Sequence, residues 1–242
     1  MGDVLIHAVF DVLAWLAAGA AGLWLLRSGR VSFPVPQPLR FSYLAALIFG
    51  AGLGAVAFGS ANLWLSGQSG IARSIEGAVA GAIVAIELYK RRAGITQRTG
   101  ARFALPFAVG VAVGRIGCYL SGLDDFTYGT PTRLPWGHDF GDGVPRHPVQ
   151  LYESAAMAAF ALVYLWRVLR RDRFFVGQGF YLAAGFYGAQ RFVWEFFKPY
   201  GAVLGPFTLF HLLSAVVCLY AIAMIATAPK PEENNAHERA FA

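Results

Sequence analysis

Long apolar runs recur along this chain, and each is about as long as a membrane-spanning helix. The hydrocarbon core of a bilayer is about 30 Å thick, so a helix needs about 20 mostly apolar residues to cross it. Segments of this kind lie at about 4–26, 41–65, 71–89, 104–122, 150–168, 177–197 and 207–228. The third is the weakest, because Glu76 and Glu87 interrupt it. We predict an all-α polytopic membrane protein with about seven transmembrane helices.

The composition argues against a soluble protein. Hydrophobic residues make up 57% of the chain and charged residues 14%, whereas soluble domains carry about 25% charged residues. The net charge of +6 does not indicate a nucleic-acid partner, because the basic residues cluster between apolar runs. Cys118 and Cys218 both lie in apolar stretches, so no disulfide framework is expected. The first apolar run has no basic segment before it and no cleavage site, so we interpret it as a retained span.

The basic residues between the runs predict the orientation. Those that follow the first, third and fifth runs are Arg27, Arg30, Arg40, Lys90, Arg91, Arg92, Arg98, Arg102, Arg167, Arg170, Arg171 and Arg173. The alternate segments carry only Arg73, Arg133, Arg146 and Lys198. Cytoplasmic loops are enriched in lysine and arginine. The N-terminus is therefore predicted outside, and the polar tail at 229–242 in the cytoplasm.

Residues 1–228 are predicted to form a single membrane domain with one long external loop, at 123–148. This loop is rich in Gly, Pro and Asp, which forbids a continuous helix, and we expect it to be ordered. Three glycine pairs have the spacing that lets membrane helices approach closely. These pairs are Gly50 with Gly54, Gly77 with Gly81, and Gly110 with Gly114.

Ionisable side chains within membrane helices are costly, so each marks a candidate functional position. Arg115 has no oppositely charged residue at helical spacing in its own span. Because a guanidinium suits an anionic phosphate, we expect Arg115 to bind a lipid phosphate. A structural ion pair with Glu153 or Glu195 is the alternative. Arg191 and Glu195 lie four residues apart, so an ion pair within one helix also accounts for them.

Other polar groups have simpler interpretations. His7 and Asp11 share the same four-residue spacing, which indicates an ion pair. Cys118 is expected to be a packing residue rather than a nucleophile. No cofactor or metal is expected, because the polar residues of the external loop show no fixed ligand spacing. These are His138, Asp139, Asp142 and His147.

Three stretches together resemble the prolipoprotein diacylglyceryl transferase family. They are GRIGCYLSG (114–122), PRHPVQLYE (145–153), and Arg191 with Glu195; LPWG (134–137) fits the same pattern. The resemblance runs over essentially the whole membrane portion. It implies a multi-pass enzyme of the bacterial inner membrane with phosphatidylglycerol, or another anionic phospholipid, as donor. The diacylglyceryl group would pass to the lipobox cysteine thiol in the signal peptide of a preprolipoprotein, releasing glycerol phosphate.

The resemblance also implies roles for individual residues. The catalytic candidates are Arg115, Arg191, Glu195 and His147. The candidates for binding substrate are Arg146, Gln150, Tyr152, Glu153, Gly114, Gly117 and Gly129.

The chain departs from the family pattern on the side that handles the acceptor. In the family signature GRxGNFxNGE, Cys118 stands at the first Asn, Ser121 at the second, and Leu123 at the Glu. The histidine of the family's HGG motif is replaced by Glu76. The aromatic residue expected in the first span is Phe10, which has no hydroxyl, and His211 takes the place of a Gln. Candidates for a compensating base are Glu76, Asp124, Asp125 and His211.

These departures predict a divergent member or paralogue that binds phosphatidylglycerol but uses the lipobox thiol weakly. The alternatives are a paralogue with a different acceptor and a non-catalytic lipid-binding scaffold. A transporter or photoreceptor is a further alternative, although a retinal Schiff base needs a lysine that 207–228 lacks.

Overall fold

The structure, a computed structural model, describes residues 2–228, so the tail predicted at 229–242 lies outside it. Within these residues the chain is almost entirely helical, which confirms the all-α prediction. The long helices are α1 (Gly2–Ser28), α2 (Arg40–Leu65), α3 (Ile75–Ala93), α4 (Ala104–Leu120), α5 (Val149–Leu169), α6 (Arg173–Glu195) and α7 (Leu209–Ala226). Short 3-10 helices are η1 (Gln37–Leu39), η2 (Ala101–Phe103) and η3 (Gly122–Asp125).

Five of the described helices are long and apolar enough to cross a membrane. They are the segments Leu5–Ser28, Gln37–Leu65, Ala101–Leu120, Val149–Leu169 and Leu209–Ala226. The remaining two, α3 and α6, carry several charged side chains, including Glu76, Glu87 and Arg191. The polytopic character is therefore confirmed, while the count of seven spans and their orientation stay predictions.

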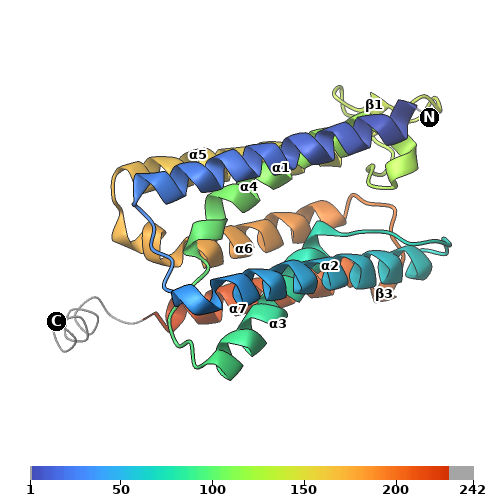
Figure 1. Cartoon of the computed structure of the whole chain (residues 1–242). Helices are drawn as coiled ribbons and strands as arrows, with labels where there is room; N and C mark the ends of the chain where they lie inside the picture. Colours follow the sequence, from blue (N-terminus) through green and yellow to red (C-terminus); the bar gives the residue numbers. More distant parts are fainter. Residues whose placement is uncertain (1, 229–242) are drawn as a thin grey trace, which may run out of the picture.

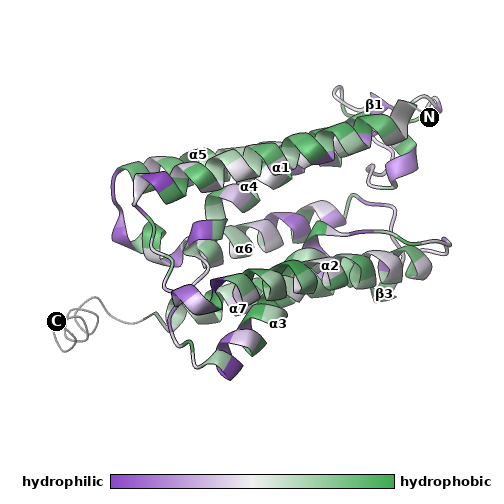
Figure 2. Ribbon diagram, in the orientation of Figure 1, coloured by the Kyte–Doolittle hydropathy of each residue, from purple (hydrophilic) through white to green (hydrophobic). Residues whose placement is uncertain are grey.

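The helices form a bundle in which α1, α4 and α5 lie on one side and α2, α3 and α7 on the other, with α6 between them (Figure 1). The start of α1 lies at the same end of the bundle as β1 and β3, whereas α7 ends at the opposite end (Figure 1). Hydrophobic residues predominate along most of the helix ribbons (Figure 2), and many of the large ones have exposed side chains. Examples are Trp15, Ile48, Phe49, Leu162 and Leu219, all exposed. Such a surface suits lipid rather than water.

Glycines bring α2 and α3 into close contact, as the small-residue spacing predicts. A Cβ atom added at Gly54 would lie 2.8 Å from Gly81 Cα, and one at Gly50 2.7 Å from the Gly81 carbonyl oxygen. Gly110 and Gly114 instead face Ala18 and Ala14 of α1. The predicted packing role of these glycines is therefore confirmed.

The loops at the end of the bundle where α1 begins are joined to one another. The 123–148 loop contains an antiparallel pair, β1 (His138–Asp139) with β2 (Pro145–Arg146). A second pair, β3 (Ala202–Leu204) with β4 (Phe207–Thr208), precedes α7. The Thr130 N–H donates to the Phe197 carbonyl at 2.6 Å, which ties the long loop to the end of α6.

Candidate functional site

A buried carboxylate, that of Glu153, lies at the centre of the bundle's charged residues. Glu153 is in the second turn of α5 and is fully buried. Its Oε1 lies 3.0 Å from Arg191 Nη1 and 3.0 Å from Lys198 Nζ, and its Oε2 pairs with Arg115 Nε. Cations from α4, from α6 and from the turn after α6 therefore converge on one carboxylate.

Arg191 connects this carboxylate to two more. Its Nη2 lies 2.7 Å from Glu195 Oε2, and its Nε lies 3.4 Å from Glu76 Oε2. The planar guanidinium presents donors along several edges, which allows this multiple pairing. Arg191 also lies over the ring of Phe210, with Cζ 5.2 Å from the centroid. The predicted ion pair within α6 is present, but it is one contact among several.

The first turns of α7 complete the network. Thr208 caps the helix and donates through Oγ1 to Glu195 Oε1 at 2.6 Å. The Thr208 backbone N–H donates to His211 Nδ1 at 3.1 Å, which leaves the proton of a neutral imidazole on Nε2. Ser214 donates to Glu76. Glu76 and His211 therefore both belong to this network, which we call the charge network.

The formal charges of the charge network cancel. Its carboxylates are Glu76, Glu153 and Glu195, and its cations are Arg115, Arg191 and Lys198. Every one of these residues is buried. A buried charge must be paired and hydrogen-bonded to be tolerated. The network is therefore self-compensated in the absence of a ligand.

Several buried, uncharged polar atoms lack a hydrogen-bond partner among the residues that the structure describes. Among them are both amide atoms of Gln150, both amide atoms of Gln190, Tyr187 Oη and His211 Nε2. Gln150 is fully buried and lies three residues before Glu153, on the same face of α5. A buried amide without a partner costs about 1–3 kcal/mol. These atoms are available to a polar ligand or to water.

An apolar cavity of about 370 Å³ lies farther along the bundle. Side chains from α1, α2, α3, α4 and α6 line it, among them Ala18, Leu47, Ile83, Phe107 and Phe180. Phe107 also packs edge-to-face on Tyr187, with ring centroids 5.2 Å apart. Tyr187 lies one helical turn from Arg191 on α6. Phe107 and Tyr187 thus connect the wall of the cavity to the helix that carries Arg191.

Known proteins resemble this chain over most of its length. A family model described as prolipoprotein diacylglyceryl transferase matches residues 4–227. The chain belongs to this family. A phosphatidylglycerol–prolipoprotein diacylglyceryl transferase of Geobacter sulfurreducens is 34% identical over 221 residues, which cover 86% of this chain and 81% of the relative. The protein of the same name from Oleidesulfovibrio alaskensis is 30% identical over 248 residues, covering 96% and 90%.

The structure gives Arg115 an oppositely charged partner, which its own helix does not offer. Arg115 pairs with Glu153, which is one of the two structural partners considered as the alternative. The reason is that α4 and α5 pack side by side, which the spacing within one helix cannot reveal. Sequence reasoning also missed Lys198. It follows Arg191 and Glu195 by seven and three residues, so helical spacing would have placed it on their face.

Residues of the family's PRHPxQLYE element lie in two different parts of the structure, the interior of the bundle and the loops at its end. Gln150 and Glu153 face the interior, whereas His147 lies against Phe197, with ring centroids 4.8 Å apart. Tyr152 accepts a hydrogen bond from Trp136 Nε1 at 2.7 Å. Arg146 donates to Asp142 at 2.6 Å, and this hydrogen bond lowers the pKa of that exposed carboxyl. Within residues 5–228, no hydrogen bond, ion pair or ring contact joins His147 or Arg146 to the charge network.

The glycines of the family's motifs serve close packing. A Cβ atom at Gly117 would lie 3.0 Å from Phe10 Cγ, where α4 crosses α1. At Gly129 it would lie 2.7 Å from His147 Cβ and would also meet the His147 carbonyl oxygen. At Gly114 the nearest atom would be at an ordinary distance of 3.7 Å. For Gly117 and Gly129 the structure thus gives a packing reason, separate from any contact with substrate.

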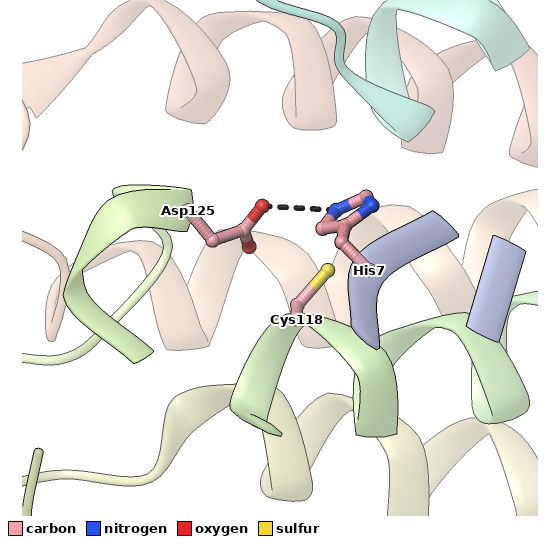
Figure 3. Close-up of side chains that lie close together, drawn as sticks. All are labelled: His7, Cys118 and Asp125. Carbon is pink, nitrogen blue, oxygen red and sulfur yellow. Dashed lines mark ion pairs between the residues drawn. The ribbon is translucent and has the colours of Figure 1, made fainter. Parts of the chain in front are cut away.

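The other two candidates for a compensating base, Asp124 and Asp125, are not members of the charge network. Asp124 is exposed. Asp125 Oδ1 lies 3.0 Å from His7 Nε2, close to Cys118 (Figure 3). His7 also keeps its predicted partner, with Nδ1 3.3 Å from Asp11 Oδ2. Cys118, which stands at the first asparagine of the family signature, is therefore part of a second polar cluster with His7 and Asp125.

Proposed function

We propose that this chain transfers the diacylglyceryl group of phosphatidylglycerol to the lipobox cysteine thiol of a prolipoprotein, in the bacterial inner membrane. Membership of the family supports this assignment. The observation that carries it is the convergence of Arg115, Arg191 and Lys198 on one carboxylate. A lipid phosphate, like the Glu153 carboxylate, is an oxyanion that accepts hydrogen bonds from arginine and lysine, so it would bind the same cations.

The reaction replaces a carbon–oxygen bond with a carbon–sulfur bond. The thiol sulfur attacks the glyceryl carbon that bears the phosphate, the carbon–oxygen bond breaks, and glycerol phosphate leaves with both bonding electrons. The thiol proton passes to a base or to the leaving phosphate, so the atoms and charges balance. Negative charge grows on the phosphate, and cations placed in a dry site stabilise it most effectively.

The candidate residues divide into groups under this proposal. Arg115 and Arg191 bind the phosphate, and Glu195 positions Arg191 through its 2.7 Å ion pair. Gln150 supplies an unpartnered amide to the head group. The apolar cavity beyond Tyr187 accommodates part of an acyl chain. His147, Arg146 and Tyr152 act at the external loop, toward the acceptor peptide.

A second candidate function is lipid binding without transfer. It is favoured by the residues at the family's acceptor positions, where Cys118 and Leu123 stand in place of an amide and a carboxylate. A lipid-binding scaffold would keep the charge network and lose turnover.

The experiment is transfer from labelled phosphatidylglycerol to a lipobox peptide, with the purified protein in nanodiscs. We expect thioether-linked diacylglyceryl peptide and one glycerol phosphate for each peptide modified. Binding of phosphatidylglycerol without peptide product would support the scaffold. Release of glycerol phosphate without peptide product would indicate a different acceptor. Failure to bind the lipid at all would contradict the proposal.

A further inference from the structure

His7, Cys118 and Asp125 come from three separate elements and meet at the end of the bundle where α1 begins (Figure 3). His7 is in the second turn of α1, Cys118 near the end of α4, and Asp125 at the end of η3. One ligand atom from each lies within 4.8 Å of the others. Cys118 is buried, while 29% of the His7 side chain is exposed, so the cluster is reachable from one side.

Outer hydrogen bonds orient two of the three groups. Asp11 Oδ2 lies 3.3 Å from His7 Nδ1, which holds a proton on that nitrogen and turns Nε2 toward Asp125. Thr127 donates to Asp125 Oδ2 at 2.5 Å and leaves Oδ1 facing His7. A carboxylate behind the remote nitrogen of a histidine is the usual support of a metal-bound imidazole.

We propose that His7, Cys118 and Asp125 form a three-ligand site for a divalent metal ion of the zinc class. Imidazole nitrogen, thiolate sulfur and carboxylate oxygen are the donors that zinc takes, in tetrahedral sites with bonds of about 2.0–2.3 Å. Ligand atoms at such distances are about 3.3–3.8 Å apart. The three ligand atoms now lie within 4.8 Å of one another, so side-chain movements of about 1 Å would bring them to this spacing. Calcium and magnesium are excluded by the sulfur and by the need for about six or more oxygen ligands.

Three protein ligands leave one tetrahedral position open, as in catalytic rather than structural zinc sites. Arg115 links this site to the charge network, because its Nη1 lies 3.8 Å from Cys118 Sγ while its Nε pairs with Glu153. The metal would therefore sit beside the cations assigned to the lipid phosphate.

The open position suits the thiol of the acceptor, a role that rests on the proposed transferase function. A thiol that coordinates a metal ion is deprotonated, and its proton passes to solvent. The metal-held thiolate then attacks the glyceryl carbon, and glycerol phosphate departs as described above. This would supply the activated sulfur in a chain that carries Leu123 and Glu76 where the family has an acid and a histidine.

The test is titration of the metal-free protein, in detergent, with Co²⁺ as a spectroscopic substitute for Zn²⁺. We expect one ion per chain, a sulfur-to-cobalt charge-transfer band and the strong visible bands of a tetrahedral ion. Cys118→Ser should abolish the charge-transfer band, whereas the matched control Cys218→Ser should keep it. Asp11→Asn should weaken binding by about 10–100-fold, as expected for an outer partner. His138→Gln, in β1, should leave the affinity unchanged.

A second measurement uses the unaltered protein, so that it does not depend on a variant that folds. Zn²⁺ should slow alkylation of Cys118 but leave alkylation of Cys218 unchanged. Cobalt binding without a sulfur band, or equal binding by Cys118→Ser, would overturn the site. Fast alkylation of Cys118 that zinc does not slow would also overturn it, in favour of a thiol activated by His7 and Asp125.

Transfer assays separate the site from its role. If chelation removes peptide transfer and Zn²⁺ restores it, while lipid binding is unaffected throughout, the role is supported. Transfer that continues after chelation would overturn the role but leave the cobalt spectrum, and the site, intact. Cobalt binding in a protein that never transfers lipid would contradict the proposed function instead.

Discussion

Glu153 on α5 and Arg191 on α6 form a buried ion pair, with Oε1 3.0 Å from Nη1. Neither side chain is more than 3% exposed. The cost of removing each charge from water is offset only while the partners stay in contact. The pair therefore fixes the relative position of two helices that carry most of the candidate site.

Replacing Glu153 by glutamine should destabilise the protein strongly. The change keeps the shape but leaves three cations without their common carboxylate, and breaking a buried pair in this way costs about 3–5 kcal/mol. Equilibrium unfolding in mixed detergent micelles would measure the loss. Glu87→Gln is the control, because Glu87 is 30% exposed and pairs with Lys90 at 3.4 Å; a cost of about 1 kcal/mol or less is expected. Similar losses for the two variants would contradict a special role for Glu153.

Arg115→Lys and Arg191→Lys should each weaken the binding of phosphatidylglycerol and slow transfer. Lysine keeps the charge but loses the planar fork with which Arg191 reaches three carboxylates. Loss of one positioned donor commonly lowers kcat by about 10²–10³-fold. The control is Arg91→Lys, at an exposed position in the last turn of α3. Parental activity of the Arg115 variant would refute the phosphate-binding role of that residue.

Lipid binding should weaken as pH rises through about 8. Burial, followed by the nearby charge of Arg191, lowers the pKa of Lys198 from 10.5 to about 8, despite the attraction of Glu153. Lys198 is therefore charged below this pH and neutral above it. Lys198→Arg should remove the pH step in a phosphatidylglycerol binding assay, and Lys198→Gln should bind weakly at every pH.

The same group should affect stability in the opposite direction. Between about pH 8 and pH 10.5 the unfolded chain holds a proton on Lys198 that the folded chain has lost. The free energy of unfolding should therefore rise with pH in this window. If lipid binding and the free energy of unfolding both rose, or both fell, with pH, Lys198 could not be the cause of both changes.

Gly54→Ala should separate α2 from α3. The added Cβ would lie 2.8 Å from Gly81 Cα, and overpacking of this kind costs about 1–3 kcal/mol. Gly52→Ala is the matched control on the same helix, because its Cβ would meet nothing within 4 Å. There the substitution should be neutral or slightly stabilising, by up to about 1 kcal/mol. Comparable unfolding curves for the two variants would contradict the close contact.

Reporter fusions test the orientation. A reporter after residue 228 should be active only in the cytoplasm, and one within 123–148 only outside. The reason is that the basic loop residues gather on the side opposite to 123–148, which is predicted to be cytoplasmic. The reverse pattern would place the charge network in the wrong leaflet for an external acceptor.

Much of the fold could be predicted from the length of the apolar runs, because a chain that crosses a bilayer must satisfy its backbone internally and does so as a helix. Some helix ends differ from the predicted limits of the apolar runs, because capping residues determine where these helices begin and end. The third helix begins at Ile75 rather than at residue 71, since Ser74 accepts from the Gly77 N–H. It continues to Ala93 because Gly94 ends it with φ 67°. The sixth begins at Arg173, after the Asp172 cap, and not at residue 177.

The sequence singles out part of the charge network, but not Lys198 and not the pairing of its members. Arg115, Arg191 and Glu153 could be singled out because ionisable residues are rare within membrane helices. That Arg115 pairs with Glu153 depends on how α4 packs on α5. The contact between His7 and Asp125 likewise joins residues far apart in sequence, and no local spacing foretells it.

The cancelled charges of the network also bear on how substrate would enter and product would leave. An arriving phosphate finds no surplus of positive charge, so it must take over a resident counter-ion's place instead of filling an electropositive hole. Under the proposed function, Glu153 would compete with the lipid phosphate for Arg115, Arg191 and Lys198. A residue of the chain itself would then lower the affinity for lipid, and the same carboxylate would favour the release of glycerol phosphate.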